Sequence, residues 1–91
     1  MKYTYAAIFE TAGDHGYAVS FPDLPGCYSQ GRTLSEALIM AQSALTQWIE
    51  YLSDKNIEIP KPSSIDDIAV NNSELVNIIH ADIVGKQAIS G

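Results

Sequence analysis

The chain has 91 residues, of which 46% are hydrophobic and 18% charged, and this composition favours one folded domain over a disordered chain. Its 11 acidic residues outnumber its 5 basic ones, and the formal net charge of −6 argues against nucleic acid as a partner and favours a basic protein. A single cysteine, Cys27, excludes an internal disulfide, and without a secretory signal or the ~18 apolar residues that span a membrane, a cytoplasmic location is expected.

The first 21 residues predict two strands joined by a loop. In KYTYAAIF at residues 2–9, alternate side chains share a face, which groups Tyr3, Tyr5, Ala7 and Phe9. Glycine and aspartate in residues 10–16 indicate a loose loop, since these residues tolerate turn conformations. YAVSF at residues 17–21 then predicts the second strand.

The next segment, PDLPG at residues 22–26, cannot form regular structure because each proline lacks a backbone donor and restricts the residue before it. A short third strand is expected at residues 27–30, and Gly31 is expected to break it. The three strands together predict an antiparallel meander.

The clearest predicted element is a helix over residues 33–53. Thr33 followed three residues later by Glu36 is a capping box, in which each side chain bonds an otherwise unpaired backbone N–H. The small residues Ala37 and Ala41 should let the helix lie close to the sheet that it covers. The apolar stripe of this helix comprises Leu34, Ala37, Leu38, Ala41, Leu45, Trp48, Ile49 and Leu52.

The remaining residues predict an extended segment at 57–63, a polar connector at 64–72 and a fourth strand at 75–81. The predicted fold class is therefore α+β, with a three-stranded antiparallel meander followed by a long helix and a late fourth strand. We expect one domain over residues 1–84 and a short tail over 85–91.

Few side chains point to catalysis. Glu10, Asp14 and Asp23 come from neighbouring strand ends and could together hold Mg²⁺, but loop carboxylates are more often simply solvated. His15 lies in a glycine-flanked turn and His80 near the end of an apolar strand, without the close spacing of a zinc site. No hydrolase nucleophile turn or glycine-rich phosphate loop occurs. The sequence therefore predicts no enzyme activity, no metal and no cofactor.

Aromatic residues point instead to protein binding. Trp48 lies on the helix stripe, where a core position is more common than a binding surface. Tyr17, Tyr28 and Tyr51 are expected to be partly exposed, and tyrosine is enriched at protein interfaces.

The segment at residues 16–37, GYAVSFPDLPGCYSQGRTLSEA, resembles the HicB antitoxin family. The likeness extends to about residues 2–83 through the long helix, a Glu-x-x-Pro-x-Pro-like stretch (here Glu58, Pro60 and Pro62) and the late strand. Physically, Gly26 should permit a backbone conformation closed to other residues, and Asp23 should bond the loop backbone as an Asx turn. The motif consists of Phe21, Pro22, Asp23, Leu24, Pro25, Gly26 and Cys27, followed by Thr33 and Glu36.

The resemblance implies a partial RNase H-like fold and an antitoxin function. Members of the HicB family bind a small basic toxin, HicA, which degrades mRNA, and cover its catalytic histidine and RNA-binding surface. We expect the acidic face and the loops to contact a HicA-like toxin, through Glu10, Asp14, His15 and Asp23. Many family members continue into a DNA-binding domain, for which residues 84–91 are too few, so direct DNA binding is not expected.

Two other functions remain open. The chain could be an orphan structural or regulatory homo-oligomer, and a homo-oligomer is expected in any case because an open sheet leaves unpaired edges. It could also be a residual metal-dependent nuclease that uses Glu10, Asp14 and Asp23.

Overall fold

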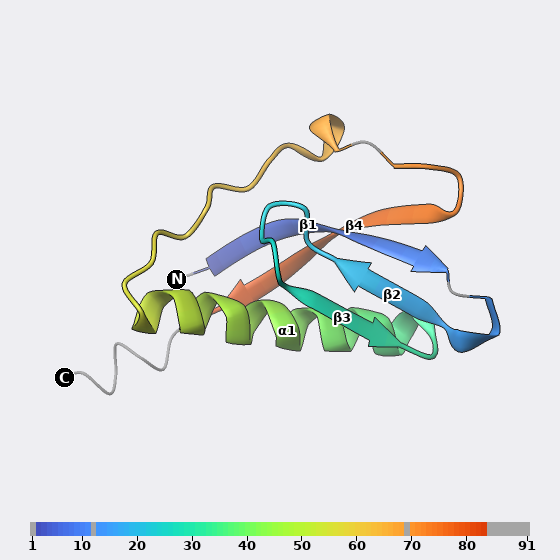
Figure 1. Ribbon diagram of the computed structural model, residues 1–91, viewed down its shortest axis with the longest axis horizontal. Coiled ribbons are helices and arrows are strands. Elements are labelled where there is room, and N and C mark those ends of the chain that lie inside the picture. Colours follow the sequence, from blue (N-terminus) through green and yellow to red (C-terminus); the bar gives the residue numbers. More distant parts are fainter. Residues whose placement is uncertain (1, 12, 69, 84–91) are drawn as a thin grey trace.

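The computed structural model describes residues 2–11, 13–68 and 70–83, which form one sheet and one long helix (Figure 1). The sheet has four strands in the order β3-β2-β1-β4, all antiparallel, so the last strand joins the first. This confirms the α+β class, the meander, the long helix and the late fourth strand. The elements are β1 (Lys2–Thr11), the 3₁₀ turn η1 (Gly13–His15), β2 (Tyr17–Ser20), β3 (Tyr28–Gly31), α1 (Leu34–Asp54), the 3₁₀ turn η2 (Ile65–Asp67) and β4 (Glu74–Asp82).

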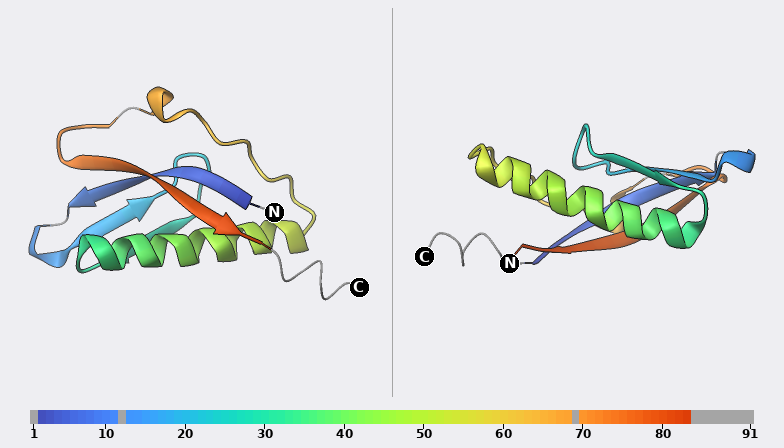
Figure 2. Two further views of the ribbon diagram at one scale, coloured as in Figure 1. Left: turned by 180° about the vertical axis from the view of Figure 1, so that it is seen from behind. Right: turned by 90° about the horizontal axis from the view of Figure 1, so that it is seen from below.

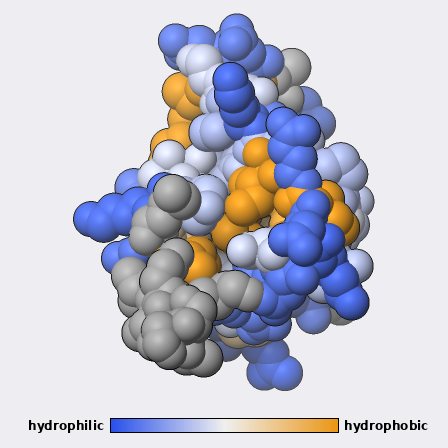
Figure 3. All heavy atoms as spheres, turned by 90° about the vertical axis from the view of Figure 1, so that its left-hand side faces the viewer, coloured by the Kyte–Doolittle hydropathy of each residue, from blue (hydrophilic) through white to orange (hydrophobic). Residues whose placement is uncertain are grey.

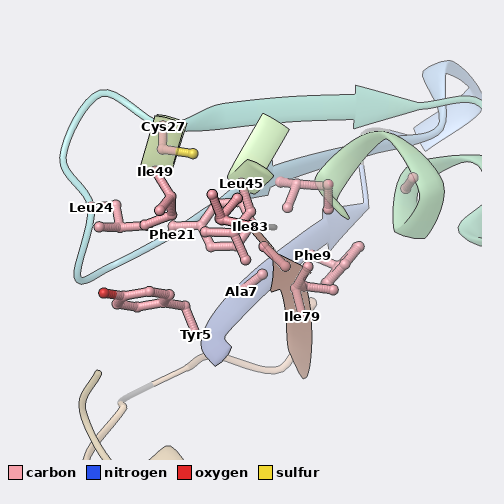
Figure 4. Packing of buried hydrophobic residues seen from close by; sticks show 14 residues of the cluster. Tyr5, Ala7, Phe9, Phe21, Leu24, Cys27, Leu45, Ile49, Ile79 and Ile83 are labelled. Carbon is pink, nitrogen blue, oxygen red and sulfur yellow. The ribbon is translucent and has the colours of Figure 1, made fainter. Parts of the chain in front are cut away.

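Helix α1 runs along one face of the sheet, and the long connection from its end to β4 passes the length of the molecule (Figures 1 and 2). The core lies between helix and sheet, as predicted for two elements that each have one apolar face. On β1 the predicted grouping of side chains is confirmed, because Tyr5, Ala7 and Phe9 are buried together in this core. The other members of this core (Figure 4) are Val19, Phe21, Leu24, Cys27, Ala37, Ala41, Leu45, Ile49, Ile79, Ala81 and Ile83.

The helix begins as predicted, with one difference in its capping bonds. The hydroxyl of Thr33 accepts the backbone N–H of Glu36 at 3.0 Å. The carboxylate of Glu36 accepts the N–H of Arg32 at 2.7 Å, not that of Thr33. Arg32 follows the last paired residue of β3, so this bond satisfies a donor that the sheet leaves free.

The sequence predicted that Gly31 would break the third strand. In the structure Gly31 is instead the last residue of β3. A Cβ atom at Gly31 would lie 2.4 Å from the backbone nitrogen of Ala37 and 2.6 Å from its Cα. Ala37 is itself fully buried. The backbone of α1 therefore lies close to the sheet edge at this glycine, and the predicted role of small helix residues is confirmed.

Other boundaries differ from the sequence-based expectation. β1 continues to Thr11 because Glu10 and Thr11 still pair with β2, although the apolar alternation ends at Phe9. On the helix stripe, Leu34 is 38% exposed and Trp48 only partly buried, so the stripe is wider than the surface that the sheet covers. In the described ranges no helix is long and apolar enough to cross a membrane. The predicted tail at 85–91 lies outside the described residues, and the finer RNase H-like assignment stays a prediction.

Candidate functional site

The segment from Phe21 to Cys27 forms two tight turns that close one end of the core. The N–H of Leu24 donates to the carbonyl of Phe21, and the N–H of Cys27 donates to that of Leu24, both at 3.0 Å. These three side chains are buried and point into the cluster shown in Figure 4. The apolar members of the recognisable motif are therefore core residues, and they act in folding.

Gly26 has the left-handed backbone conformation that the sequence predicted, with φ at 97°. It also lies under Trp48, since a Cβ atom at Gly26 would be 3.0 Å from the tryptophan ring. Trp48 packs against the core and remains partly accessible. Trp48 is therefore part of both the core packing and the accessible surface.

Asp23 binds a distant part of the chain. Its carboxylate accepts the backbone N–H of Ser63 at 2.7 Å and the Ser63 hydroxyl at 2.6 Å. Nearby, the hydroxyl of Tyr5 donates to the carbonyl of Pro60. The expected Asx turn within the loop is not formed, because both carboxylate oxygens bond to the 57–63 segment instead. Asp23 therefore holds that segment against the loop.

Cys27 is a buried core residue with a free thiol. Burial raises the pKa of its thiol to about 11, because the thiolate would lose its hydration. The sulfur lies 3.9 Å from the carbonyl oxygen of Ala44, to which the thiol donates. At neutral pH the thiol is protonated, which makes it a poor nucleophile and metal ligand.

The charged residues predicted as partner contacts lie in two places. Glu10 is exposed near the end of β1, and η1, which contains Asp14 and His15, follows directly. Asp23 follows the opposite end of β2, in the loop described above. Among residues 2–11, 13–68 and 70–83, no three His, Cys, Asp or Glu side chains are placed to hold a metal ion. Glu10, Asp14 and Asp23 therefore do not form the magnesium site that the sequence left open.

The structure adds an acidic neighbour that the sequence could not reveal. Glu74, the first residue of β4, lies directly opposite Glu10 of β1. Like charges opposite one another on a sheet repel, so this pair costs some stability and concentrates negative charge. We call Glu10, Asp14 and Glu74 the acidic end. Only the β1–β4 register, which no local pattern encodes, brings Glu74 to it.

A second surface feature is a groove between α1 and the edge strand β3. It consists of adjoining hollows, the largest of about 450 Å³, lined by side chains of both elements. Tyr28 is 68% exposed, Met40 46% and Tyr51 48%, and the rings of Trp48 and Tyr51 lie 5.8 Å apart. We call these four residues the aromatic groove. The predicted exposure of Tyr28 and Tyr51 is confirmed, and exposed aromatic side chains of this kind are typical of protein interfaces.

Exposed apolar residues continue past the end of α1, where Ile57 is 48% exposed. Figure 3 views this end of the molecule and shows hydrophobic residues gathered among hydrophilic ones. Apolar surface framed by polar residues is a common property of protein-binding sites.

Comparison with known proteins identifies the family. A family model described as the HicB-like antitoxin of bacterial toxin–antitoxin systems matches residues 5–85. The chain belongs to this family. The resemblance seen in the sequence motif is thereby confirmed.

Individual relatives agree with the family assignment. A 14.9 kDa protein of Haemophilus phage HP1 is 37% identical over 83 residues, which are 87% of this chain and 61% of the phage protein. Antitoxin HicB 1 of Photorhabdus laumondii is 41% identical over 61 residues, 67% of this chain and 39% of that antitoxin. The UPF0150 protein Ta0767 of Thermoplasma acidophilum is 42% identical over 64 residues, 70% of this chain and 90% of that protein. The chain therefore spans less than two thirds of the phage protein and of the Photorhabdus antitoxin.

Solved structures match the fold. A chain of a toxin–antitoxin complex from Streptococcus pneumoniae superposes with a TM-score of 0.80 and 26% identity, covering 90% of this chain and 70% of that one. The N-terminal domain of the Burkholderia pseudomallei antitoxin HicB superposes with a TM-score of 0.74 over 89% of this chain and all of the other, at 18% identity. At 18% identity, the second match supports the fold assignment only.

Proposed function

We propose that this chain is an antitoxin that binds a small basic HicA-type toxin and neutralises it by covering the surface with which the toxin binds and degrades mRNA. The observation that carries the proposal is the family match over residues 5–85. The likeness to a chain of a toxin–antitoxin complex at 26% identity supports it. The proposal places the chain in the cytoplasm, where the toxin meets mRNA.

The charge of the chain supports a basic partner. Its formal net charge is −6, and attraction between opposite charges accelerates the association of two proteins. We propose that Glu10, Asp14 and His15 contact the toxin, with Glu74 beside them at the acidic end. Asp23, whose oxygens are bonded to Ser63, would contribute by holding the 57–63 segment in place.

Neutralisation by coverage needs no catalytic group on the antitoxin. The protonated Cys27 thiol and the separation of Asp23 from the acidic end support a binding role over a nuclease role. The partner would be held by ordinary interface contacts, and charge would set mainly the rate of binding.

Co-expression with a small basic protein encoded beside the gene tests the proposal. The expected result is a stable complex on size exclusion, together with rescue of growth that the basic protein alone arrests. A neighbouring protein that is neither toxic nor bound would overturn the antitoxin function and leave the orphan homo-oligomer as the explanation.

A pair of charge-reversed variants tests the contact site separately. Reversal of Glu10 and Asp14 to lysine should slow association by about tenfold or more at low salt, because long-range attraction is lost. Reversal of Asp66 and Asp67 in η2 changes the net charge equally and is the matched control. Equal effects of the two variants would contradict the proposed contacts while leaving the antitoxin function intact.

A further inference from the structure

The outer edge of β4 carries backbone groups that do not bond to β1. The N–H of Thr11 donates to the carbonyl of Ser73, which fixes the alternation of bonds between the two strands. Leu75, Asn77, Ile79 and Ala81 therefore bond β1, and the residues between them direct N–H and carbonyl groups outward. In agreement, the N–H of Ile78 is accepted by the side chain of Asn77, at 2.9 Å, and not by β1.

This edge lacks most of the features that protect edge strands. Glu74–Asp82 contains no lysine and no proline, and its 9 residues extend over ~30 Å. Leu75 is 51% exposed and Ile78 38% exposed. Within the described residues no other strand pairs with this side of β4. The Asn77–Ile78 bond is a local substitute for one of the missing strand bonds.

We propose that β4 pairs antiparallel with β4 of a second copy of this chain, about a two-fold axis at Asn77. The pairing joins two four-stranded sheets into one continuous sheet. Such an interface is isologous, so each residue pair occurs twice.

The charges favour this register over the one whose axis lies at Ile78. Outward-facing residues must pair with one another, which restricts the axis to a few positions. An axis at Ile78 would place Glu74 opposite Asp82 twice, and like charges opposite one another are destabilising. An axis at Asn77 places Glu74 opposite His80 twice, and a histidine ring N–H can donate to a carboxylate. One Glu74 oxygen already accepts the N–H of Asn71 at 2.9 Å, which leaves the other for His80 of the second copy.

The same register brings apolar side chains together on both faces. Val76 lies opposite Ile78 of the second copy, and Leu75 lies opposite Ile79 on the helix side of the sheet. A hollow of about 180 Å³ adjoins Ile79 there, lined by Leu38 and Gln42 of α1 and by β4 itself. Leu75 of the second copy would enter this hollow. The strand is thus complementary to itself in hydrogen bonding and in the placement of its apolar side chains.

Dimerisation exchanges one bond for another at Ile78. Its N–H would pass from the Asn77 side chain to the carbonyl of Val76 in the second copy, so the monomer keeps this donor satisfied. The exchange of hydrogen bonds therefore adds little to the free energy of dimerisation. We expect a dimer of moderate affinity, whose fraction rises with protein concentration in the micromolar range.

A cysteine at the axis provides the test. Across the axis the two copies of residue 77 form a non-hydrogen-bonded pair with Cα atoms about 4.5 Å apart, which suits a disulfide. Asn77→Cys should give a disulfide-linked dimer under mild oxidation, and circular dichroism should show an unchanged fold. The native Cys27 is buried and does not interfere. Ser43→Cys, on the exposed side of α1, is the control for random collision.

A second test exchanges the residues of the Glu74–His80 pair and introduces no new cysteine. Glu74→Lys should weaken the dimer at least about fivefold in sedimentation equilibrium, since the carboxylate that accepts the ring N–H of His80 is replaced by a group that cannot accept a hydrogen bond. Adding His80→Glu should restore it. The proposal is overturned if Asn77→Cys cross-links no faster than Ser43→Cys. It is equally overturned if the wild-type chain stays monomeric at high micromolar concentration and β4 is protected from hydrogen exchange only by another protein.

Discussion

Asp23 fastens the 57–63 segment to the loop at 22–26, and its removal should loosen the end of the core that lies beneath. The carboxylate accepts two hydrogen bonds from Ser63, at 2.7 and 2.6 Å. The two residues are 40 positions apart in the chain, so these bonds close a loop that contains β3 and α1. Replacement by alanine removes both bonds at once.

The size of the effect follows from the exposure of the two partners. Hydrogen bonds to a charged group contribute about 1.5–3 kcal/mol each when water is excluded. Ser63 is exposed and Asp23 partly buried, so solvent screening lowers each to roughly 0.5–1 kcal/mol. Asp23→Ala should therefore reduce the free energy of unfolding by about 1–2 kcal/mol. In a domain of this size that corresponds to a melting temperature lower by roughly 5–10 °C.

Urea unfolding measures this difference, and the fluorescence of Trp48 reports it because the ring covers Gly26 in the same loop. Asp14→Ala removes the same charge from an exposed site and should change stability by less than about 0.5 kcal/mol. Ser63→Ala keeps the backbone bond and should lose about half of the Asp23 effect. Combining Asp23→Ala with Ser63→Ala should cost less than the sum of the two single changes.

If Asp23→Ala were as stable as Asp14→Ala, the Ser63 bonds would contribute nothing and the assigned role of Asp23 would be wrong. If instead the variant were stable but bound the toxin more weakly, Asp23 would be a direct contact, as the sequence first suggested.

Four further outcomes are expected. Gly31→Ala should destabilise the fold by about 2–3 kcal/mol, since the new methyl group would meet backbone atoms of Ala37; an unchanged urea midpoint would show that α1 can move aside at little cost. Thr33→Ala should lower the free energy of unfolding by about 1 kcal/mol, because the helix loses its N-cap hydrogen bond. Ser35→Ala, at an exposed position, is the control. Equal urea midpoints for the two variants would show that the cap contributes nothing to stability. Alkylation of Cys27 in the folded protein should rise with pH towards a midpoint near pH 11, because burial raises the pKa of the thiol to about 11. A raised thiol pKa also means that stability falls as the pH rises from about 9 towards 11, since the unfolded state releases the proton first; rapid labelling at pH 8 would contradict both expectations.

Much of the fold could be read from the sequence because its signals are local. Alternation in KYTYAAIF indicated which residues of β1 share a face, and the stripe behind Thr33 indicated the length of α1 to within a residue at each end. The Phe21–Cys27 run identified the family, since its turns depend on particular residues at neighbouring positions.

The site was less accessible from the sequence. The acidic residues Glu10 and Asp14 were found, but their neighbour Glu74 was not, because 64 positions of chain separate Glu10 from Glu74 and only the strand register joins them. Trp48 was assigned to the core from its place on the helix, whereas its accessible side depends on where the sheet edge ends.

The sequence by itself determined the elements, the family and the apolar faces, because each depends on spacings of two to four residues along the chain. The tertiary structure decided which distant residues meet: Asp23 with Ser63, and Glu10 with Glu74. It also decided which side of β4 is left open, since the bond from Thr11 to Ser73 sets the direction of every donor that follows. Local pattern fixes what a segment forms, and the packing of the whole chain fixes what that segment faces.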